Sequence, residues 1–503
     1  MLAVALSASI VGVDGVPVRV EVDVSFGLPG LTIVGLAGSA VLEARERVRA
    51  ALRNSGFEVP ARRITVNLAP ANLPKEGTGH DLAIAVGILV ASGQLDGSRL
   101  SGTALIGELA LDGSLRPIPG AMALVAATRG AGAGDAIVPI ENAEESAAIG
   151  GLRVRSAATL AQVTRHLAGV EQLASVPRPP PRLGSAVAVD APDLASVIGQ
   201  AVGRRALEVA VAGRHNLAFS GPPGVGKTLL ARATAGILPP LSVEEATEVS
   251  RIHSVAAVID RHAPLSLRRP FRAPHHTIST QALVGGGPRV RPGEASLAHR
   301  GALFLDETLQ FRVDALDALR GPIDAGTVHI GRVDGFVTLP ARFMLIAAFN
   351  PCPCGFAGVT GHACRCEDGH RRRYQARLSG PMRDRLDLVV HLEPVVAAPH
   401  ARRPSEPSAD VARRIARASR LQLERQGGPN ADLEAARLDA SAGFEPRVLD
   451  MLERRGRQMA LSLRRLHRAA RVARTIADLD GAERVASDHL DEALQHRPKE
   501  LAA

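Results

Sequence analysis

One stretch of the sequence, residues 216–236, has the residue types that bind phosphate groups. An apolar run, 217–219, leads into a glycine-rich loop and then into a helical segment that begins with Lys227 and Thr228. The glycines allow a tight turn that aims backbone N–H groups at an anion, and the helix dipole adds to the attraction. We expect Lys227 to reach the β- and γ-phosphates of a nucleotide and Thr228 to bind Mg²⁺. The residues expected to bind ATP are Gly221, Pro222, Pro223, Gly224, Val225, Gly226, Lys227 and Thr228.

Two carboxylates follow a second apolar run, 302–305. We expect Asp306 to hold Mg²⁺ through water and Glu307 to orient and polarise the water that attacks the γ-phosphate. A third apolar run ends in Asn350, which we expect to position the same water. Solvated carboxylates at a strand end are common, so it is the phosphate-binding loop earlier in the chain that favours the catalytic interpretation.

All the cysteines of the chain come shortly after Asn350, in two Cys-X-Cys pairs. Four thiolates can surround one zinc ion tetrahedrally, and clustered cysteines in a reducing compartment more often bind metal than form disulfides. Cys-X-X-Cys is the more familiar spacing, so reduced, metal-free thiols and a disulfide stay open as alternatives. A metal here would brace the strand of Asn350 or present a rigid surface to DNA or a partner. The candidate ligands are Cys352, Cys354, Cys364 and Cys366.

The length and the net charge of the chain limit the classes of protein to which it can belong. A chain of 503 residues is too long for one ordinary core, so two or three domains are expected. The longest apolar run, 82–92, is too short to span a bilayer, and the N-terminus continues into an alternating strand rather than a cleavage site. We therefore expect a cytoplasmic protein without a membrane partner. The net charge of +9 suits DNA, but nearly all the basic residues are arginine, which is also typical of a GC-rich genome.

The pattern of the chain predicts three structured regions. Strands at 16–24, 64–70 and 136–140 alternate with a helix at 41–56, and a proline-rich stretch then marks a boundary. After a second break the chain has helical spacing to its end. The expected regions are 1–170, a linker at 171–191, a nucleotide-binding core at 192–397 and a helical region at 398–503.

Together these segments resemble the AAA+ ATPases, and most closely the magnesium-chelatase-like ComM/YifB family, over essentially the whole chain. The segments that carry the resemblance are 269–307, NPCPCG at 350–355, LSGPMRDRLDL at 378–388 and 461–481. The resemblance implies an α/β AAA+ core with a helical C-terminal lid, and an adenine pocket bordered by 193–200. It also implies a ring, usually a hexamer, with ATP between subunits.

In such a ring, Arg385 matches the arginine finger that reaches a neighbour's γ-phosphate, and Arg464 matches the sensor-2 arginine of the lid. Either is also interpretable as an ordinary surface arginine. The sequence departs from the family pattern at Arg383, where an apolar residue is usual, and at 308–311, which reads TLQF instead of LPEF. Both carboxylates before that segment are retained.

The family also carries two insertions that point into the channel of the ring. They correspond to 271–293 and 327–343, and the second alternates as two strands, 327–331 and 336–339, around a turn. Contact with DNA and contact between subunits are both consistent with these insertions. The candidate DNA contacts are Arg289, Arg291, His329 and Arg332.

The first region resembles the α+β Lon-protease-like (S5-like) domain, through 75–89. The position of the nucleophilic serine is Gly79 here, and Arg116 occupies the region where a lysine base is sought. Arginine stays protonated and cannot act as a base, so we expect an interaction module without peptidase activity.

The resemblance implies an ATP-driven ring motor that acts on DNA, as in branch migration during natural transformation. The alternative is a chelatase-type motor that remodels a protein partner, and a third class is a scaffold whose ATPase serves only assembly. The expected cofactors are ATP and Mg²⁺, with Zn²⁺ at the cysteines.

Overall fold

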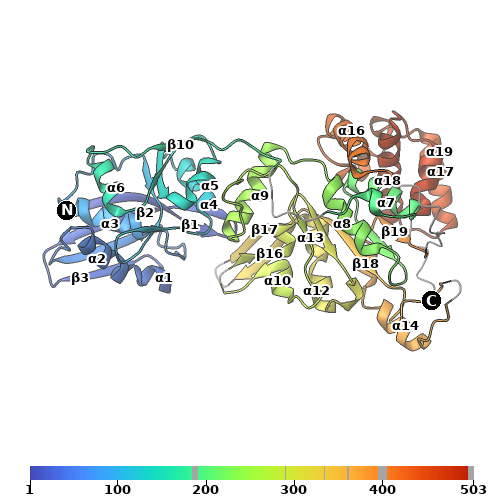
Figure 1. Ribbon diagram of the computed structural model, residues 1–503, viewed down its shortest axis with the longest axis horizontal. Coiled ribbons are helices and arrows are strands. Elements are labelled where there is room, and N and C mark those ends of the chain that lie inside the picture. The colour runs from blue at the N-terminus through green and yellow to red at the C-terminus, as the bar shows by residue number, and fades with distance from the viewer. Residues whose placement is uncertain (184–190, 289, 333–334, 360–361, 395–404, 497–503) are drawn as a thin grey trace.

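The computed structural model describes residues 1–183, 191–288, 290–332, 335–359, 362–394 and 405–496. Figure 1 shows three regions in a row along the longest axis: an N-terminal region built on a sheet, a middle region on a second sheet, and a C-terminal group of helices. Within the described residues, no helix is both long enough and apolar enough to cross a membrane.

The N-terminal region is an eight-stranded sheet in the order β10-β9-β8-β5-β1-β2-β4-β3. Its strands are β1 Leu2–Val11, β2 Asp14–Ser25, β3 Gly30–Val34, β4 Arg63–Ala69, β5 Thr103–Leu105, β8 Asp135–Pro139, β9 Arg153–Ala157 and β10 Ser175–Val176, with the hairpin β6 Glu108–Leu109 and β7 Leu115–Arg116 beside them. Its helices are α1 Ser39–Leu42, α2 Ala44–Asn54, α3 Asp81–Ala91, α4 Ala121–Gly130, α5 Ala143–Ala147 and α6 Leu160–Leu167. The strands and helix expected in this region are confirmed as β2, β4, β8 and α1 with α2.

Helix α3 is buried along its whole length and begins beside a buried polar cluster. His80 contacts the hydroxyl groups of Ser7 and Ser9 at 3.0 and 3.1 Å. Burial, with a smaller contribution from Lys75, lowers the pKa of His80 to about 4, so the imidazole is neutral at pH 7. Gly79 lies next to this cluster, and Arg116 is exposed. Since both serines are almost completely buried, the cluster joins α3 to β1 inside the core.

The first part of the expected linker belongs to the N-terminal sheet, because Ser175 and Val176 pair with β9 as β10. Farther along, Arg182 exchanges backbone hydrogen bonds with Leu265 and Leu267 of the middle region, at 3.0 and 2.7 Å. The proline-rich segment is therefore bound at both of its described ends.

The middle region is a five-stranded parallel sheet in the order β12-β15-β18-β11-β19. Its strands are β11 Leu217–Ser220, β12 Phe271–Arg272, β15 Ala302–Leu305, β18 Met344–Phe349 and β19 Leu388–His391. Its helices are α7 Ala201–Gly213, α8 Lys227–Ile237, α9 Val243–Val255, α10 Thr280–Val284, α11 Glu294–Leu297, α12 Val313–Ala318, α13 Arg320–Ala325, α14 Asp368–Gln375 and α15 Gly380–Arg383. The strands read as near-continuous apolar runs because helices cover both faces of the sheet.

Two short antiparallel hairpins project from this sheet. They are β13 Gly285–Gly286 with β14 Arg291–Pro292, and β16 Thr327–Arg332 with β17 Gly335–Pro340. The second confirms the hairpin expected from the alternating residues of 327–343. Figure 1 shows it on the side of the middle region that faces the N-terminal sheet. At Gly12 a β-carbon would lie 2.7 Å from Val337 Cγ1, so the turn between β1 and β2 packs directly on β17.

The N-terminal region is also joined to the middle region through α9. Ser254 of α9 donates a hydrogen bond to the buried Glu145 at 2.5 Å, and its carbonyl accepts from the N–H of Gly120 at 2.9 Å. Arg251 pairs with Asp14 at 3.2 Å. These contacts link the N-terminus of α4, helix α5 and the hairpin β1–β2 to one helix of the middle region.

Four helices form the C-terminal region: α16 Ser408–Gln426, α17 Pro446–Gln458, α18 Leu463–Asp480 and α19 Ser487–Gln495. One hydrophobic cluster includes their apolar faces together with α7, α8 and the strands β11 and β18. At the end of α18, the buried Asp478 accepts hydrogen bonds at 2.8–2.9 Å from Arg425, Arg474 and Asn430. The lid and the nucleotide-binding core therefore share one interior.

We expect Asp478→Ala to lower the free energy of unfolding by about 3–5 kcal/mol, because it leaves the buried guanidinium of Arg474 and the half-buried one of Arg425 without their carboxylate. Urea denaturation followed by circular dichroism measures this change. The matched control is Glu453→Ala, which removes an exposed ion pair with Arg457 and should change stability by less than about 1 kcal/mol. Equal effects of the two substitutions would contradict the role assigned to the buried network.

Candidate nucleotide-binding site

The carboxyl ends of three neighbouring strands bring the predicted catalytic residues together. Strand β18 lies between β11, which leads into the phosphate loop, and β15, which ends before Asp306. Lys227 Nζ donates a hydrogen bond to Asn350 Oδ1 at 2.9 Å, and Thr228 Oγ1 donates to Asp306 Oδ2 at 2.9 Å. Residues from three separate segments of the sequence thus meet at one edge of the sheet.

The phosphate loop has the backbone geometry that its glycines predict. Gly224 and Gly226 have φ of +79° and +93°, and Gly226 is the residue from which α8 begins at Lys227. A β-carbon at Gly221 would lie 2.5 Å from the carbonyl oxygen of Leu392, so a side chain is excluded there. The N–H groups of the first turn of α8 are therefore open to an anion.

The ammonium group of Lys227 is held inside this loop. It donates to the carbonyl oxygens of Gly221 and Pro222 at 2.8 and 2.7 Å, besides its contact with Asn350. Burial lowers the pKa of Lys227 below its ordinary value, whereas the nearby Asp306 and Glu307 act to raise it. A bound phosphate would supply the negative charge that this partly buried cation lacks.

Glu307 has a backbone conformation that is unusual for a glutamate. Its φ is +48°, its N–H donates to Asp306 Oδ1 at 3.0 Å, and its side chain is 61 % exposed. A non-glycine residue in the left-handed region persists only where its surroundings enforce it, and such residues cluster at functional sites. The turn directs the Glu307 carboxylate away from the strand and leaves it open to solvent, as a water-activating base requires.

His276 is a neighbour of Glu307 that sequence reasoning missed. Its Nδ1 lies 3.8 Å from Glu307 Oε2, and its ring contacts those of His275 and Phe311 with centroids 4.1 and 6.4 Å apart. The two histidines follow β12, which consists of two residues and pairs with β15. Since so short a strand has no periodicity of its own, the consecutive histidines were the only signal in the sequence.

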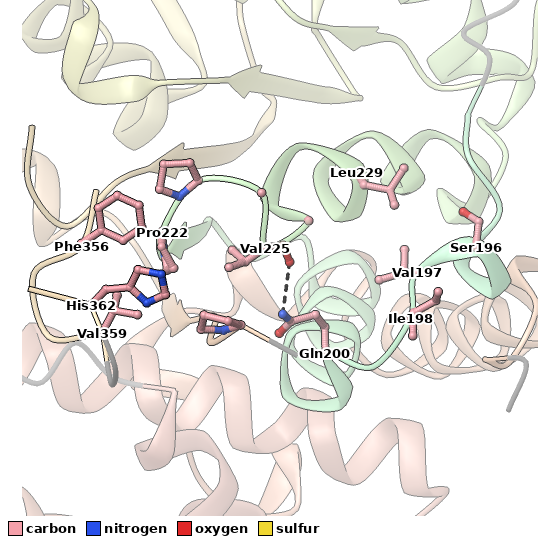
Figure 2. Close-up of a pocket in the computed structure, with 14 residues that line it drawn as sticks. Ser196, Val197, Ile198, Gln200, Pro222, Val225, Leu229, Phe356, Val359 and His362 are labelled. Atoms are coloured by element: carbon pink, nitrogen blue, oxygen red, sulfur yellow. Dashed lines mark hydrogen bonds between the residues drawn. The ribbon is translucent and has the colours of Figure 1, made fainter. Parts of the chain in front are cut away.

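A pocket of about 420 Å³ lies beside the phosphate loop (Figure 2). The segment expected to border the adenine lines it with Ser196, Val197, Ile198 and Gln200. Gln200 Nε2 donates to the carbonyl oxygens of Val225 and Glu393 at 3.1 and 2.8 Å, which fixes this segment against the loop. An apolar wall next to a phosphate cradle suits the base and ribose of a nucleotide.

The opposite wall of the pocket comes from the cysteine loop, which sequence reasoning did not place there. Phe356, Val359 and His362, all between the two cysteine pairs, line the pocket, and Figure 2 shows them across from Val197 and Ile198. Among the described residues, the four cysteine sulfurs form the one cluster that offers a set of metal ligands, all within 4.8 Å of one another.

The two candidate catalytic arginines lie together but outside this pocket. Arg385 and Arg464 both pair with Asp324 of α13, Arg464 at 2.9 Å. Arg385 is 8 % exposed and also donates to the carbonyl oxygens of Arg320 and Pro381. The unusual Arg383 donates to the carbonyls of Leu378 and Gln375, at 3.0 and 2.6 Å, and so does not disturb Arg385. The described residues that line the nucleotide pocket include no arginine.

The candidate DNA contacts lie on the two hairpins, away from the nucleotide pocket. Arg332 donates to the carbonyl oxygens of Gly287 and Pro288, so the two insertions touch each other. His329 contacts the hydroxyl groups of Thr327 and Thr338 at 3.2 and 3.1 Å. Arg291 is exposed in β14, and Arg289 lies outside the described residues.

Comparison with family models finds three matches, which follow one another along the chain. Residues 193–399 match the family described as magnesium chelatase, subunit ChlI. Residues 20–142 match subunit ChlI of Mg-chelatase, and residues 405–497 match the C-terminal domain of the same subunit.

Individual relatives cover the whole chain. The YifB protein of Salmonella typhimurium is 45% identical over 500 residues, which span 99% of this chain and 97% of the relative. The competence protein ComM of Haemophilus influenzae is 41% identical over 503 residues, with 99% and 97% covered. The magnesium-chelatase 67 kDa subunit of Heliobacterium mobile is 29% identical over 194 residues, which cover 33% of this chain and 29% of that protein.

The site predicts that binding and hydrolysis of ATP depend on different residues. Lys227→Ala should weaken ATP binding about 10–100-fold, because it removes the charged donor to the phosphates. Glu307→Gln keeps the shape of the site and should bind ATP normally while hydrolysis slows about 10²–10⁴-fold. Calorimetric titration and a phosphate-release assay measure the two quantities. A Glu307→Gln variant that hydrolyses at the wild-type rate would exclude this residue as the base.

Proposed function

The chain belongs to the magnesium-chelatase ChlI-type family of AAA+ ATPases, in its YifB and ComM branch, and from this premise we propose that it is a ring-forming motor that uses ATP to move DNA. The family implies ATPase activity. The observation that carries the proposal is the meeting point of β11, β15 and β18, where residues of the phosphate loop lie within hydrogen-bond distance of the carboxylate of Asp306 and the amide of Asn350.

The residues at this junction divide the hydrolysis reaction among them. Thr228 Oγ1 and Asp306 Oδ2 face each other at 2.9 Å, and such oxygen ligands are the type that Mg²⁺ prefers, so the site fits this ion. When bound, Mg²⁺ neutralises charge on the phosphates. Lys227 holds the phosphate chain, Glu307 accepts the proton of the attacking water, and Asn350 orients that water.

The position of the two arginines supports hydrolysis between subunits. Phosphoryl transfer needs a cation that meets the developing charge, yet Arg385 and Arg464 are paired with Asp324 outside their own pocket. We propose that both act on the nucleotide of an adjacent subunit in a ring, with a hexamer as the expected size. Arg385 is then the finger, and Arg464 contributes from the lid.

The two insertions, which touch each other, support DNA as the polymer that the motor moves. They carry Arg291, His329 and Arg332, and the chain has a net charge of +9. Contacts from arginine to phosphate are independent of base sequence, which suits a motor that moves along DNA. The name of the competence protein relative is consistent with a role in natural transformation, and we propose branch migration as the activity.

The proposal extends to the remaining parts of the chain. We propose that the N-terminal region is a Lon-protease-like interaction module without peptidase activity and that the cysteine cluster binds zinc. We also propose that the protein is located in the cytoplasm. The proposed domains are 1–170, 192–397 and 398–503, and the segment 171–191 joins the first two, with its strand β10 paired to the N-terminal sheet.

We expect Arg385→Ala to reduce ATP hydrolysis at least about 10³-fold while each subunit still binds ATP, because the finger acts on a neighbour. Phosphate release and calorimetric titration measure the two effects. Mixing Arg385→Ala with Glu307→Gln subunits should restore activity at interfaces that pair an intact finger with an intact base. The control Arg457→Ala changes an exposed arginine of α17. A fully active Arg385→Ala chain that stays monomeric with Mg-ATP would exclude the ring.

DNA should stimulate ATP hydrolysis if it is the moving substrate. The rates with no DNA, single strands, duplex and a four-way junction provide the test, with the junction giving the largest increase. Arg291→Ala should weaken DNA binding and reduce the slope of log affinity against log salt by about 1, because one phosphate contact is lost. Arg457→Ala again serves as control. No stimulation by any DNA would favour a chelatase-type motor that acts on a protein, the alternative that the Heliobacterium relative suggests.

A further inference from the structure

Three of the four cysteine sulfurs lie at about the separations of a tetrahedral metal site, and the fourth, Cys366 Sγ, lies within 4.8 Å of each of them. Cys352 Sγ lies 3.3 Å from Cys354 Sγ and 3.7 Å from Cys364 Sγ, and the Cys354–Cys364 distance is 3.6 Å. Zn–S bonds of about 2.3 Å in a tetrahedron place the sulfurs roughly 3.8 Å apart. These separations are far too long for an S–S bond of about 2.05 Å, so the arrangement favours a shared ion over a disulfide.

Backbone groups stabilise the same sulfurs as acceptors. The N–H of Cys354 donates to Cys366 Sγ at 3.4 Å, and the N–H of Ala357 donates to Cys352 Sγ at 3.3 Å. These two N–H groups help to fix the positions of Cys366 Sγ and Cys352 Sγ from outside the cluster. Four cysteine sulfurs in a tetrahedron suit zinc, and iron is the other common metal that takes this ligand set.

The cluster is connected to the nucleotide pocket by very short segments. Gly355 follows Cys354 directly, has φ of +87°, and packs so closely on the phosphate loop that a β-carbon would lie 2.4 Å from Pro223 Cδ. Phe356 comes next, and its ring stacks on that of His362 with centroids 5.0 Å and planes 9° apart. Both rings line the pocket, so the position of this wall depends on where the cysteines are held.

The loop has no regular secondary structure of its own to hold it. Its described residues, 350–359 and 362–366, form no helix or strand, and of its four cysteines Cys352 alone is buried. A segment without ladder hydrogen bonds or a core of its own pays a large conformational entropy to stay ordered. A metal ion that joins both ends of the loop offsets this entropy, as structural zinc does in small domains.

We propose that a zinc ion bound by Cys352, Cys354, Cys364 and Cys366 fixes Phe356 and His362 as the wall of the nucleotide pocket, so that tight nucleotide binding requires the metal. This inference rests on the proposed ATPase function and adds a structural cofactor to its binding step. The nucleotide base lies between this aromatic wall and the segment of Val197 and Ile198. Loss of zinc, by chelation or by oxidation of the thiols, then weakens nucleotide binding while the phosphate loop itself stays intact.

The test compares metal content with nucleotide affinity in the full-length chain. Wild-type protein should contain about one zinc per chain by mass spectrometry of the metal. The double variant Cys364→Ser with Cys366→Ser should lose the zinc and bind ADP about tenfold more weakly in calorimetric titration. Phe356→Ala should keep the zinc and also weaken ADP binding about tenfold, the size expected for loss of an aromatic ring that stacks on a base.

Two controls separate this effect from damage to the fold. Phe26→Ala removes an equally large ring that is 88 % exposed in the N-terminal region and should change neither zinc content nor ADP affinity. Chelation of zinc from the wild-type chain, followed by its return, should lower and then restore ADP affinity without any substitution. Because no residue is changed in this experiment, recovery of ADP affinity when zinc is returned cannot be attributed to damage caused by a substitution.

The outcomes are distinct for the two proposals. A wild-type chain without zinc, or a zinc-free chain that binds ADP as tightly as the loaded one, overturns this inference and leaves the ATPase proposal standing. A zinc-loaded wild-type chain that binds no ADP overturns the ATPase proposal itself. A Phe356→Ala variant that retains zinc and binds ADP as tightly as the wild type would show that the metal site has no role in the pocket. This result also contradicts the inference.

Discussion

The position of β18 between β11 and β15 is the constraint on which the candidate site depends. Parallel pairing on both sides sets the ends of these strands at the same level, with Ile346 beside Phe304 on one side and beside Leu217 on the other. The phosphate loop then brings Lys227 to Asn350 and Thr228 to Asp306. A slip in either pairing would move these groups apart by the rise of a strand residue, about 3.3 Å, which is more than a hydrogen bond tolerates.

Local motifs in the sequence predicted this part of the site well, because each motif determines its own geometry. The glycines of the phosphate loop, the carboxylates after 302–305 and the terminal Asn350 all act at the end of the strand that precedes them. The same holds for the hairpin of β16 and β17, whose alternation is visible in the sequence.

Contacts between distant segments could not be predicted from such motifs. The proximity of His276 to Glu307 requires β12 to pair with β15, and two residues carry too little pattern to show this. The aromatic wall of Phe356 and His362 requires Gly355 to pack on Pro223, a contact between residues far apart in the chain. Sequence reasoning saw the cysteines as a metal site next to Asn350, but burial and packing decide which pocket their loop faces.

Asp324 joins the two halves of the proposed mechanism, because of its place in the chain. Helix α13, which contains Asp324, is followed directly by the hairpin β16–β17, and this hairpin is followed by β18 with Asn350 at its end. One end of the hairpin is thus close to the arginines proposed to serve the neighbouring nucleotide, and the other leads to the residue proposed to orient water in its own site. An arginine that leaves Asp324 for a γ-phosphate loses an ion pair at the base of the hairpin. In the proposed mechanism, hydrolysis at either nucleotide would have a short covalent path to the loops that carry the candidate DNA contacts, without a separate transmission element.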